Sequence, residues 1–358
     1  MTEKNTDFTL TEASSLSLNI LRLIAAQLVL VGHEINVLKL TSWLKFSNGI
    51  YIQFVAIVIF FLISGFLIPY SVVRKLSDKG YSFVSYLIER FSRIYSGYLP
   101  AILLVIILDA IYIKFLPTVF PYLNGFKVKN LITNLLMLQY YPSTTFGSGR
   151  VFWTLGLWWW IYLSYGWIFI NKKLRLNQPI LWWGILACFL IVPVYNLINE
   201  KGQWLSLVWV MGLGIYYYLK KPKLRINQAT DYLLSIIFFI LSIIRLVATG
   251  KEFELGFGLG LSLSLLFLLT ALQRNRNKIN HFVKRFISFF AGYSFTLYLI
   301  HYTILIFFLG LNLPLPPTLT FLMIWFTSNV LSILIAKFTE LKYKELATKF
   351  NNLVSSTI

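Results

Sequence analysis

The sequence predicts an all-α, polytopic integral membrane protein with about ten transmembrane helices and both termini in the cytoplasm. Of its 358 residues, 58% are hydrophobic and only 13% are charged, a composition that excludes a soluble enzyme. Apolar runs of ~20 residues, long enough to cross a bilayer, recur along the whole chain. Because these runs are continuous rather than alternating, a membrane β-barrel is disfavoured.

Ten apolar runs predict ten spans, at 17–37, 52–73, 94–115, 151–170, 179–198, 203–219, 230–249, 255–272, 287–310 and 318–339. The net charge of +19 gathers in the segments that follow the even-numbered spans, which favours membrane orientation over nucleic-acid binding. These basic residues are Arg74, Lys75, Lys79, Arg90, Arg93, Lys172, Lys173, Arg175, Lys220, Lys221, Lys223, Arg225, Arg274, Arg276, Lys278, Lys284 and Arg285. The positive-inside rule places them in the cytoplasm, together with both termini.

This orientation divides the chain into a cytoplasmic N-terminal segment at 1–16, a membrane domain at 17–340 and a cytoplasmic tail at 341–358. The N-terminus lacks the features of a cleaved signal peptide, so we expect the first span to act as a signal anchor. The longest outer segment, 116–150, contains Pro117, Pro121, Pro142 and a Gly-Ser-Gly cluster. Its apolar middle is too short to span, so we expect it to lie at the interface or to re-enter the membrane.

Arg22 and His33 stand out because ionisable residues inside an apolar span are costly and usually functional. Eleven positions bring two helical residues onto one face within ~20°, about 16 Å apart. Arginine suits phosphate groups, whereas histidine, with an ordinary pKa of ~6.5, suits general-base catalysis. The simpler alternatives are that Arg22 reaches the cytoplasmic headgroups and that His33 is a packed polar residue.

Arg90 and Arg93 share a helix face near the expected cytoplasmic boundary. They suit a phosphate-bearing donor that arrives from the cytoplasm, although ordinary positive-inside anchoring is the simpler explanation. Ser64 and Gly65 interrupt the strongly apolar second span. Most small-residue pairs of this kind allow close helix packing.

Three further features suit a polar cavity. Trp153 and Trp158, with their neighbours, crowd the outer end of the fourth span, where an interfacial aromatic belt and sugar stacking are the alternatives. Tyr298 and His301 lie within the ninth span and indicate either a hydrogen-bonded core or a cavity wall. Glu340 ends the tenth span, and we expect it to pair with a basic residue.

Taken in order, these segments resemble the acyltransferase-3 family of integral-membrane O-acyltransferases. The family's opening Arg, ten residues and His are matched by Arg22 and His33. Its other motifs match FF-x-x-SGF-L-I at 60–68, R-x-x-R-I with a later Tyr at 90–98, W-[ST]-L at 153–155, S-[YF]-[ST]-x-Y-L-x-H at 294–301 and the acidic Glu340. The resemblance covers about 18–340. It departs from the family pattern at Ser96, where the family has proline, and at Trp158, where the family usually has glutamate.

The resemblance implies transfer of an acyl group, most often acetyl, from cytoplasmic acetyl-CoA or another acyl-CoA to a hydroxyl of an extracytoplasmic or lipid-linked glycan. It implies a catalytic role for His33, as general base, and for Arg22. It also implies a donor site at Arg90, Arg93, Ser64 and Tyr98, and further cavity residues at Trp153, Tyr298, His301 and Glu340.

The expected partners are membrane lipid, acyl-CoA and the glycan or lipid-linked sugar acceptor, with a homodimer or polysaccharide-synthesis partners as further possibilities. We expect no nucleic acid, no permanently bound cofactor and no metal site, since the chain has only three histidines. The expected location is the inner (plasma) membrane. Two alternatives stay open: a carrier or flippase for a lipid-linked sugar or anion, and a non-catalytic partner in polysaccharide synthesis.

Overall fold

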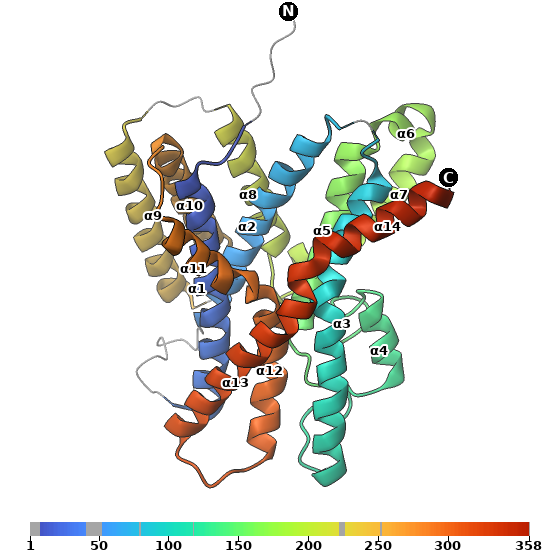
Figure 1. Ribbon diagram of the computed structural model, residues 1–358, viewed down its shortest axis with the longest axis vertical. Coiled ribbons are helices and arrows are strands. Elements are labelled where there is room, and N and C mark those ends of the chain that lie inside the picture. Colours follow the sequence, from blue (N-terminus) through green and yellow to red (C-terminus); the bar gives the residue numbers. More distant parts are fainter. Residues whose placement is uncertain are drawn as a thin grey trace, which may run out of the picture. The chain divides into compact units, whose positions relative to one another are not determined.

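The computed structural model describes residues 8–40, 52–78, 80–116, 118–221, 226–250 and 253–357. Lys79, Pro117, Lys223 and Arg225 lie outside these ranges, and the side chains of Lys172 and Lys173 are likewise not described. Figure 1 shows that the described chain is helical throughout, which confirms the all-α class. Its elements are α1 (Glu12–Leu38), α2 (Ile52–Lys75), α3 (Phe83–Phe115), α4 (Val128–Leu135), α5 (Phe152–Ile170), α6 (Lys172–Asn177), α7 (Pro179–Ile198), α8 (Leu205–Lys220), α9 (Gln228–Thr249), α10 (Leu255–Arg274), α11 (His281–Gly292), α12 (Ser294–Gly310), α13 (Pro317–Phe338), the 3₁₀ helix η1 (Glu340–Lys342) and α14 (Tyr343–Thr357).

Among the described residues, seven helices are long and apolar enough to cross a membrane, or eight if α11 and α12 form one broken span. All ten predicted positions are helical, but the count of about ten spans is not reached on these criteria. The helix α5 is long enough to cross a membrane, but its tryptophans and tyrosines lower its mean hydropathy too far. The helix α8 is too short, with only 16 residues. The orientation of the termini stays a prediction.

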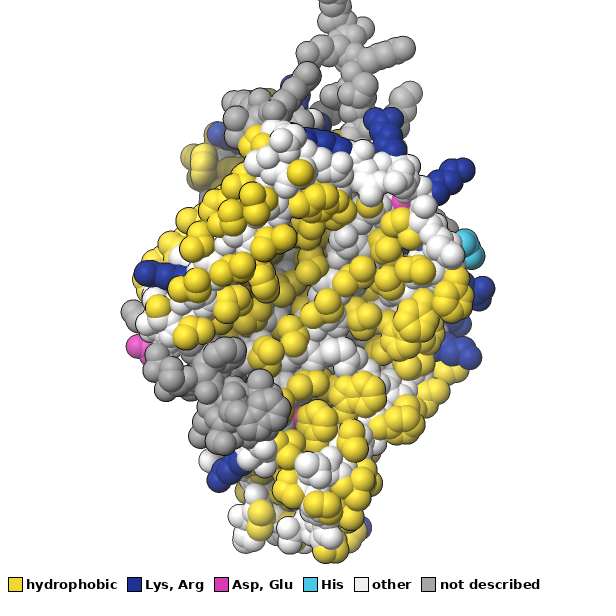
Figure 2. All heavy atoms as spheres, turned by 90° about the vertical axis from the view of Figure 1, so that its left-hand side faces the viewer, with side chains coloured by type: hydrophobic (Ala, Val, Ile, Leu, Met, Phe, Trp, Pro, Cys, Tyr) yellow, Lys and Arg dark blue, Asp and Glu magenta, His cyan; other side chains and the backbone are white. Residues whose placement is uncertain are grey.

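The surface agrees with a membrane environment. Figure 2 shows a face on which hydrophobic side chains cover most of the middle and Lys and Arg lie toward the edges. On α9, the large apolar residues Leu233, Ile236, Phe239 and Ile240 are all exposed. Side chains of this kind are unfavourable in water and suited to lipid.

The contacts of the chain separate two compact units. Unit 1 comprises Met1–Ala25, Trp43–Lys79 and Glu200–Ala291, and unit 2 comprises Ala26–Ser42, Gly80–Asn199 and Gly292–Ile358. Each unit combines distant parts of the sequence, and α1 contributes its first half to unit 1 and its second half to unit 2. The single membrane domain at 17–340 stays a prediction.

Unit 1 is held together by close packing between α2 and α8. A Cβ atom at Gly65 would collide with the backbone carbonyl of Trp209, and one at Gly212 would collide with the carbonyl of Leu62. Only glycine lets the two backbones approach so closely. The Ser-Gly interruption of the second span is therefore a packing feature.

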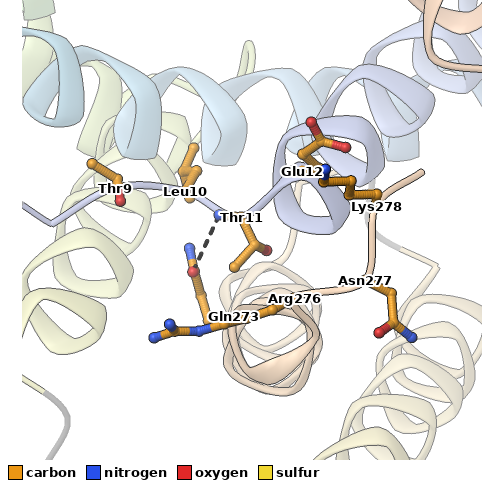
Figure 3. Close-up of a pocket in the computed structure, with 8 residues that line it drawn as sticks. All are labelled: Thr9, Leu10, Thr11, Glu12, Gln273, Arg276, Asn277 and Lys278. Atoms are coloured by element: carbon orange, nitrogen blue, oxygen red, sulfur yellow. Dashed lines mark hydrogen bonds between the residues drawn. The ribbon is translucent and has the colours of Figure 1, made fainter. Parts of the chain in front are cut away.

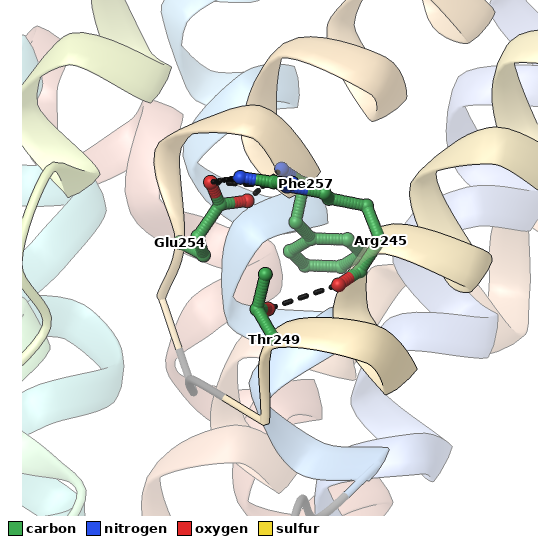
Figure 4. A network of polar contacts seen from close by, with 4 residues as sticks. All are labelled: Arg245, Thr249, Glu254 and Phe257. Atoms are coloured by element: carbon green, nitrogen blue, oxygen red, sulfur yellow. Dashed lines mark hydrogen bonds and ion pairs between the residues drawn. The ribbon is translucent and has the colours of Figure 1, made fainter.

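The second pair in unit 1, α9 and α10, is joined by ion pairs near both ends. Arg245 pairs with Glu254 at 3.0 Å, and Glu254 also accepts the backbone N–H of Phe257 at 2.8 Å, which caps α10 (Figure 4). Burial alone would raise the pKa of Glu254, but these bonds outweigh it and lower that pKa. Near the other end, Asp231 pairs with Arg274 at 3.0 Å.

Unit 2 is built around α12, which packs against both α3 and α13. The residues of α12 are apolar on every side of the helix, the pattern of an enclosed helix, and most of them are buried. The helix α3 begins earlier than predicted, at Phe83, because Ser82 caps it by accepting the N–H of Ser85 at 3.2 Å. Arg90 and Arg93 therefore lie well inside a regular helix.

Glu340 joins three elements of unit 2. It is completely buried, and its Oε1 pairs with Arg93 of α3 at 2.9 Å. Its Oε2 accepts the backbone N–H and the hydroxyl of Thr296, at 2.9 and 2.8 Å, in the first turn of α12. The structure thus gives Glu340 a basic partner and makes it a cap for α12.

The α2–α8 contact predicts that Gly65→Ala lowers stability by ~1–3 kcal/mol, the usual cost of forcing atoms into a packed site. The matched control is Gly214→Ala in α8, where a Cβ would meet nothing within 4 Å. Thermal unfolding of the detergent-solubilised protein measures both. Equal melting temperatures for the two variants would contradict the packing account.

The Glu340 contact predicts that Glu340→Gln lowers stability by ~3 kcal/mol, at the low end for a broken buried ion pair, since the Arg93 side chain keeps 26% exposure. Glu345→Gln, on the exposed side of α14, should leave stability within ~0.5 kcal/mol of the parent. The same melting experiment compares them, and a harmless Glu340→Gln would show that this contact does not anchor α12.

Candidate active site

Two histidines from distant parts of the chain meet in unit 2. The imidazole of His33 on α1 lies 5.4 Å from that of His301 on α12, measured between ring centroids. The ring of Tyr302 stands edge-on to His33 at 5.0 Å. This half of α1 is fixed to α13 through Gln27, whose amide donates to Asn329 at 2.7 Å and accepts from Trp325 at 3.0 Å. The sequence singled out both histidines, and the structure brings them together.

The hydrogen bonding of His301 fixes which of its nitrogens is basic. His301 is fully buried, and its Nδ1 lies 3.1 Å from the carbonyl oxygen of Leu297. Since a carbonyl oxygen only accepts, Nδ1 carries the hydrogen and Nε2 keeps its lone pair. Among the described residues, Nε2 has no hydrogen-bond partner. A buried imidazole with a free lone pair is suited to accepting a proton.

Aromatic and hydroxyl groups surround the pair. Tyr298 lies 6.2 Å from His301 between ring centroids, and its hydroxyl shares a hydrogen bond of 2.6 Å with Thr154. Trp158 lies 6.0 Å from Tyr298, so an indole stands here where the family usually has a carboxylate. Trp153 packs on Tyr140 instead, at 5.9 Å.

The structure adds three residues that sequence reasoning missed. Tyr302 shares a hydrogen bond of 2.6 Å with Tyr122 of the 116–150 segment, and the guanidinium of Arg150 interacts with both hydroxyls. We call Arg150, Tyr122 and Tyr302 the donor cluster, because all three carry hydrogen-bond donors; the name does not refer to the acyl donor. Arg150 follows the Gly-Ser-Gly turn and comes three residues before the W-T-L motif. The only feature of the sequence that could have identified Arg150 was a single cation between the Gly-Ser-Gly turn and the W-T-L motif.

The loop that carries Arg150 is fastened to α3. Asp109 accepts the backbone N–H of Ser148 at 2.7 Å and its hydroxyl at 2.6 Å, and the Asp109 side chain is buried. Gly147 has φ +51°, and a Cβ there would collide with the Asp109 carboxylate. The turn therefore requires glycine at this position.

Glu34 is a further residue that the sequence analysis did not select. It follows His33 on α1 and is completely buried, and neither carboxyl oxygen has a hydrogen-bond partner in the described part of the chain. Consecutive helical residues point ~100° apart. Glu34 therefore faces a different side of α1 from His33.

The predicted donor residues have varied surroundings. Arg93 is paired with Glu340, and its guanidinium lies over the rings of Tyr343 at 4.9 Å and Phe295 at 5.6 Å. Arg90 lies 5.6 Å over Tyr86 and has Glu89 at 3.6 Å. Of the two arginines, Arg90 has the weaker ion pair and therefore the more available charge.

Tyr98 is fully buried and donates to the backbone carbonyl of Asn134 at 3.1 Å, at the end of α4. It thereby helps to fasten the outer segment to α3. Ser64 donates to the carbonyl of Phe61 at 3.0 Å within α2. Arg22 and Ser64 belong to unit 1, whereas the histidine pair and both α3 arginines belong to unit 2.

Unit 1 contains a separate polar cavity of about 400 Å³ beside the start of α1 (Figure 3). Its lining residues are Thr9, Leu10, Thr11, Glu12, Gln273, Arg276, Asn277 and Lys278. The N–H of Thr11 donates to Gln273 at 3.3 Å, and Glu12 pairs with Lys284 at 3.0 Å. None of the candidate site residues lines this cavity. No group of three His, Cys, Asp or Glu side chains within the described ranges could hold a metal ion.

Comparison with known proteins identifies the family of the chain. A family model described as an acyltransferase domain matches residues 15–337, nearly the whole chain. No curated protein and no solved structure gave a match. The match begins before Arg22 and ends just before Glu340, so it includes both histidines of the pair and the α3 arginines. The chain therefore belongs to the acyltransferase-3 family of membrane acyltransferases.

Proposed function

We propose that this protein is an inner-membrane O-acyltransferase that moves an acetyl group from cytoplasmic acetyl-CoA to a hydroxyl of an extracytoplasmic or lipid-linked glycan. Family membership supports acyl transfer, and the distribution of Lys and Arg supports cytoplasmic termini. The observation that carries the proposal is the histidine pair. An unpaired imidazole lone pair beside a second imidazole, both in a membrane protein of this family, is a proton-accepting site.

In this proposal His33 takes the proton of the acceptor hydroxyl as its oxygen attacks the thioester carbonyl carbon. The ring separation of 5.4 Å places His301 Nε2 within reach of an N–H of His33 when the two nitrogens face each other. His301 then acts as a positioning residue, because accepting that N–H leaves the other nitrogen of His33 free for the acceptor. The carbon–sulfur bond breaks, and the departing thiolate receives the proton from His33.

The site for the acyl donor is proposed from the positions of the positively charged side chains. The phosphates of acetyl-CoA require cations, and Arg90, with only Glu89 at 3.6 Å, is the α3 arginine best able to serve. Arg93 contributes through N–H groups that Glu340 does not engage, and Tyr98 on the same helix completes the proposed donor site within unit 2. The donor roles of Arg22 and Ser64, which belong to unit 1, stay expectations from the family resemblance. Trp153 and Tyr298 are proposed to line the cavity. Trp158 offers no carboxylate, so proton transfer rests on the two histidines.

Single substitutions of the histidines test this proposal. His33→Ala should lower label transfer from radiolabelled acetyl-CoA to crude surface glycans by ~10²–10⁴-fold, the usual contribution of a general base. His301→Ala should cost less, about tenfold, because it acts through His33. The exposed His281→Ala on α11 is the control and should keep the parent rate. The protein is assayed purified in nanodiscs.

Parent-level transfer by His33→Ala would exclude it as the base. Movement of a lipid-linked sugar across liposomes without CoA turnover would instead indicate a carrier. A parent protein that neither turns over acetyl-CoA nor moves sugar, but binds polysaccharide-synthesis proteins, would indicate a non-catalytic partner.

A further inference from the structure

We propose that the donor cluster of Arg150, Tyr122 and Tyr302 holds the oxyanion that forms on the acyl carbonyl during transfer. This inference rests on the proposed function and assigns it a second catalytic group. The cluster adjoins the histidine pair, because the ring of Tyr302 lies 5.0 Å from that of His33. A base and an anion-binding group are therefore held side by side within unit 2.

The hydrogen bonds of the cluster leave donors free. The hydroxyls of Tyr122 and Tyr302 are 2.6 Å apart, so one of their two hydrogens lies between the oxygens. Arg150 interacts with both hydroxyls, and its five N–H groups outnumber these two oxygens. The second hydroxyl hydrogen and the remaining N–H groups have no acceptor within the cluster. Such a group suits a ligand atom that only accepts hydrogen bonds.

The charge of the cluster is uncompensated. Within the described ranges Arg150 pairs with no carboxylate, although it hydrogen-bonds two hydroxyls. Burial alone would lower the pKa of Arg150, but the hydrogen bonds with the two tyrosines outweigh it and raise that pKa. The guanidinium therefore stays protonated at every working pH. A permanent positive charge beside a proton-accepting pair matches a reaction that develops negative charge there.

The cluster is also fixed before substrate arrives. Asp109 fastens the Ser148 backbone and hydroxyl at 2.7 and 2.6 Å, two residues before Arg150, and the two tyrosines hold the guanidinium itself. Donors that need no rearrangement when charge develops give the largest electrostatic contribution to catalysis. Asp109 is thus a positioning residue for Arg150.

The acceptor oxygen bonds to the thioester carbonyl carbon while its proton moves to His33. The carbonyl π electrons move to oxygen, and Arg150 N–H and the free tyrosine O–H donate to that oxyanion. When the intermediate collapses, the C=O bond re-forms, the C–S bond breaks, and the thiolate of CoA takes the proton from His33.

Arg150→Gln and Tyr302→Phe test the inference in nanodiscs, with acetyl-CoA and crude glycans separated into neutral and acidic fractions. Arg150→Gln should lower kcat ~10²–10³-fold for both fractions while the KM for acetyl-CoA stays unchanged, as for a lost oxyanion donor. Tyr302→Phe removes one hydroxyl and should lower kcat about tenfold. Arg150→Lys should recover part of the activity because it keeps the charge. The exposed Lys129→Gln on α4 is the matched control and should keep the parent rate.

Each outcome has one meaning. A parent kcat in Arg150→Gln overturns the inference, as does a defect confined to the KM of acidic glycans, which would make Arg150 a binder of acceptor carboxylates. If Arg150→Gln does not fold, Arg150→Lys and Tyr302→Phe decide, and parent kcat in both overturns the inference. If the parent protein itself turns over no acetyl-CoA, the proposed function is wrong, and the inference falls with it for that separate reason.

Discussion

A buried carboxylate determines how α12, the helix that carries His301 in unit 2, is held. Glu340 neutralises Arg93 and caps the first turn of α12 through Thr296, with all three contacts at 2.8–2.9 Å. In a low-dielectric interior neither charge is tolerated alone, so the pair fixes the start of α12 against α3. Tyr298, His301 and Tyr302 follow on the same helix. The position of the candidate site therefore depends on a contact within about two helical turns of it.

The site itself combines two opposite requirements. The first is a hydrogen-bond acceptor: in the proposed mechanism His301 Nε2 accepts an N–H of His33, and its lone pair is available because the Nδ1 hydrogen of His301 is directed at the Leu297 carbonyl. The second is a hydrogen-bond donor: Arg150, which we propose binds the oxyanion, interacts with two tyrosine hydroxyls and with no carboxylate among the described residues. The family's usual glutamate at this place would add a negative charge. Trp158 instead leaves a neutral wall beside Tyr298.

Hydropathy and motif spacing predicted the positions of the helices and the two α1 residues, but not the contacts between segments that are far apart in the sequence. The apolar runs gave a helix at each expected position, and the spacing of Arg22 and His33 placed both on α1, because helix periodicity is local. The Arg93–Glu340 pair and the donor cluster were beyond such reasoning, since they join residues far apart in sequence. Arg150 depends on a loop conformation fixed by Asp109 and Gly147. The count of about ten spans is not confirmed, because α8 is too short and α5 has too low a mean hydropathy to count as spans on these criteria.

The central claim, a buried imidazole with a free lone pair, is most directly tested by ¹⁵N NMR of histidine-labelled protein in nanodiscs. With only three histidines in the chain, the single-alanine variants assign every signal. The account predicts that His301 shows a protonated Nδ1 and an unprotonated Nε2 at neutral pH. A protonated Nε2, in either the other tautomer or the imidazolium, would contradict it.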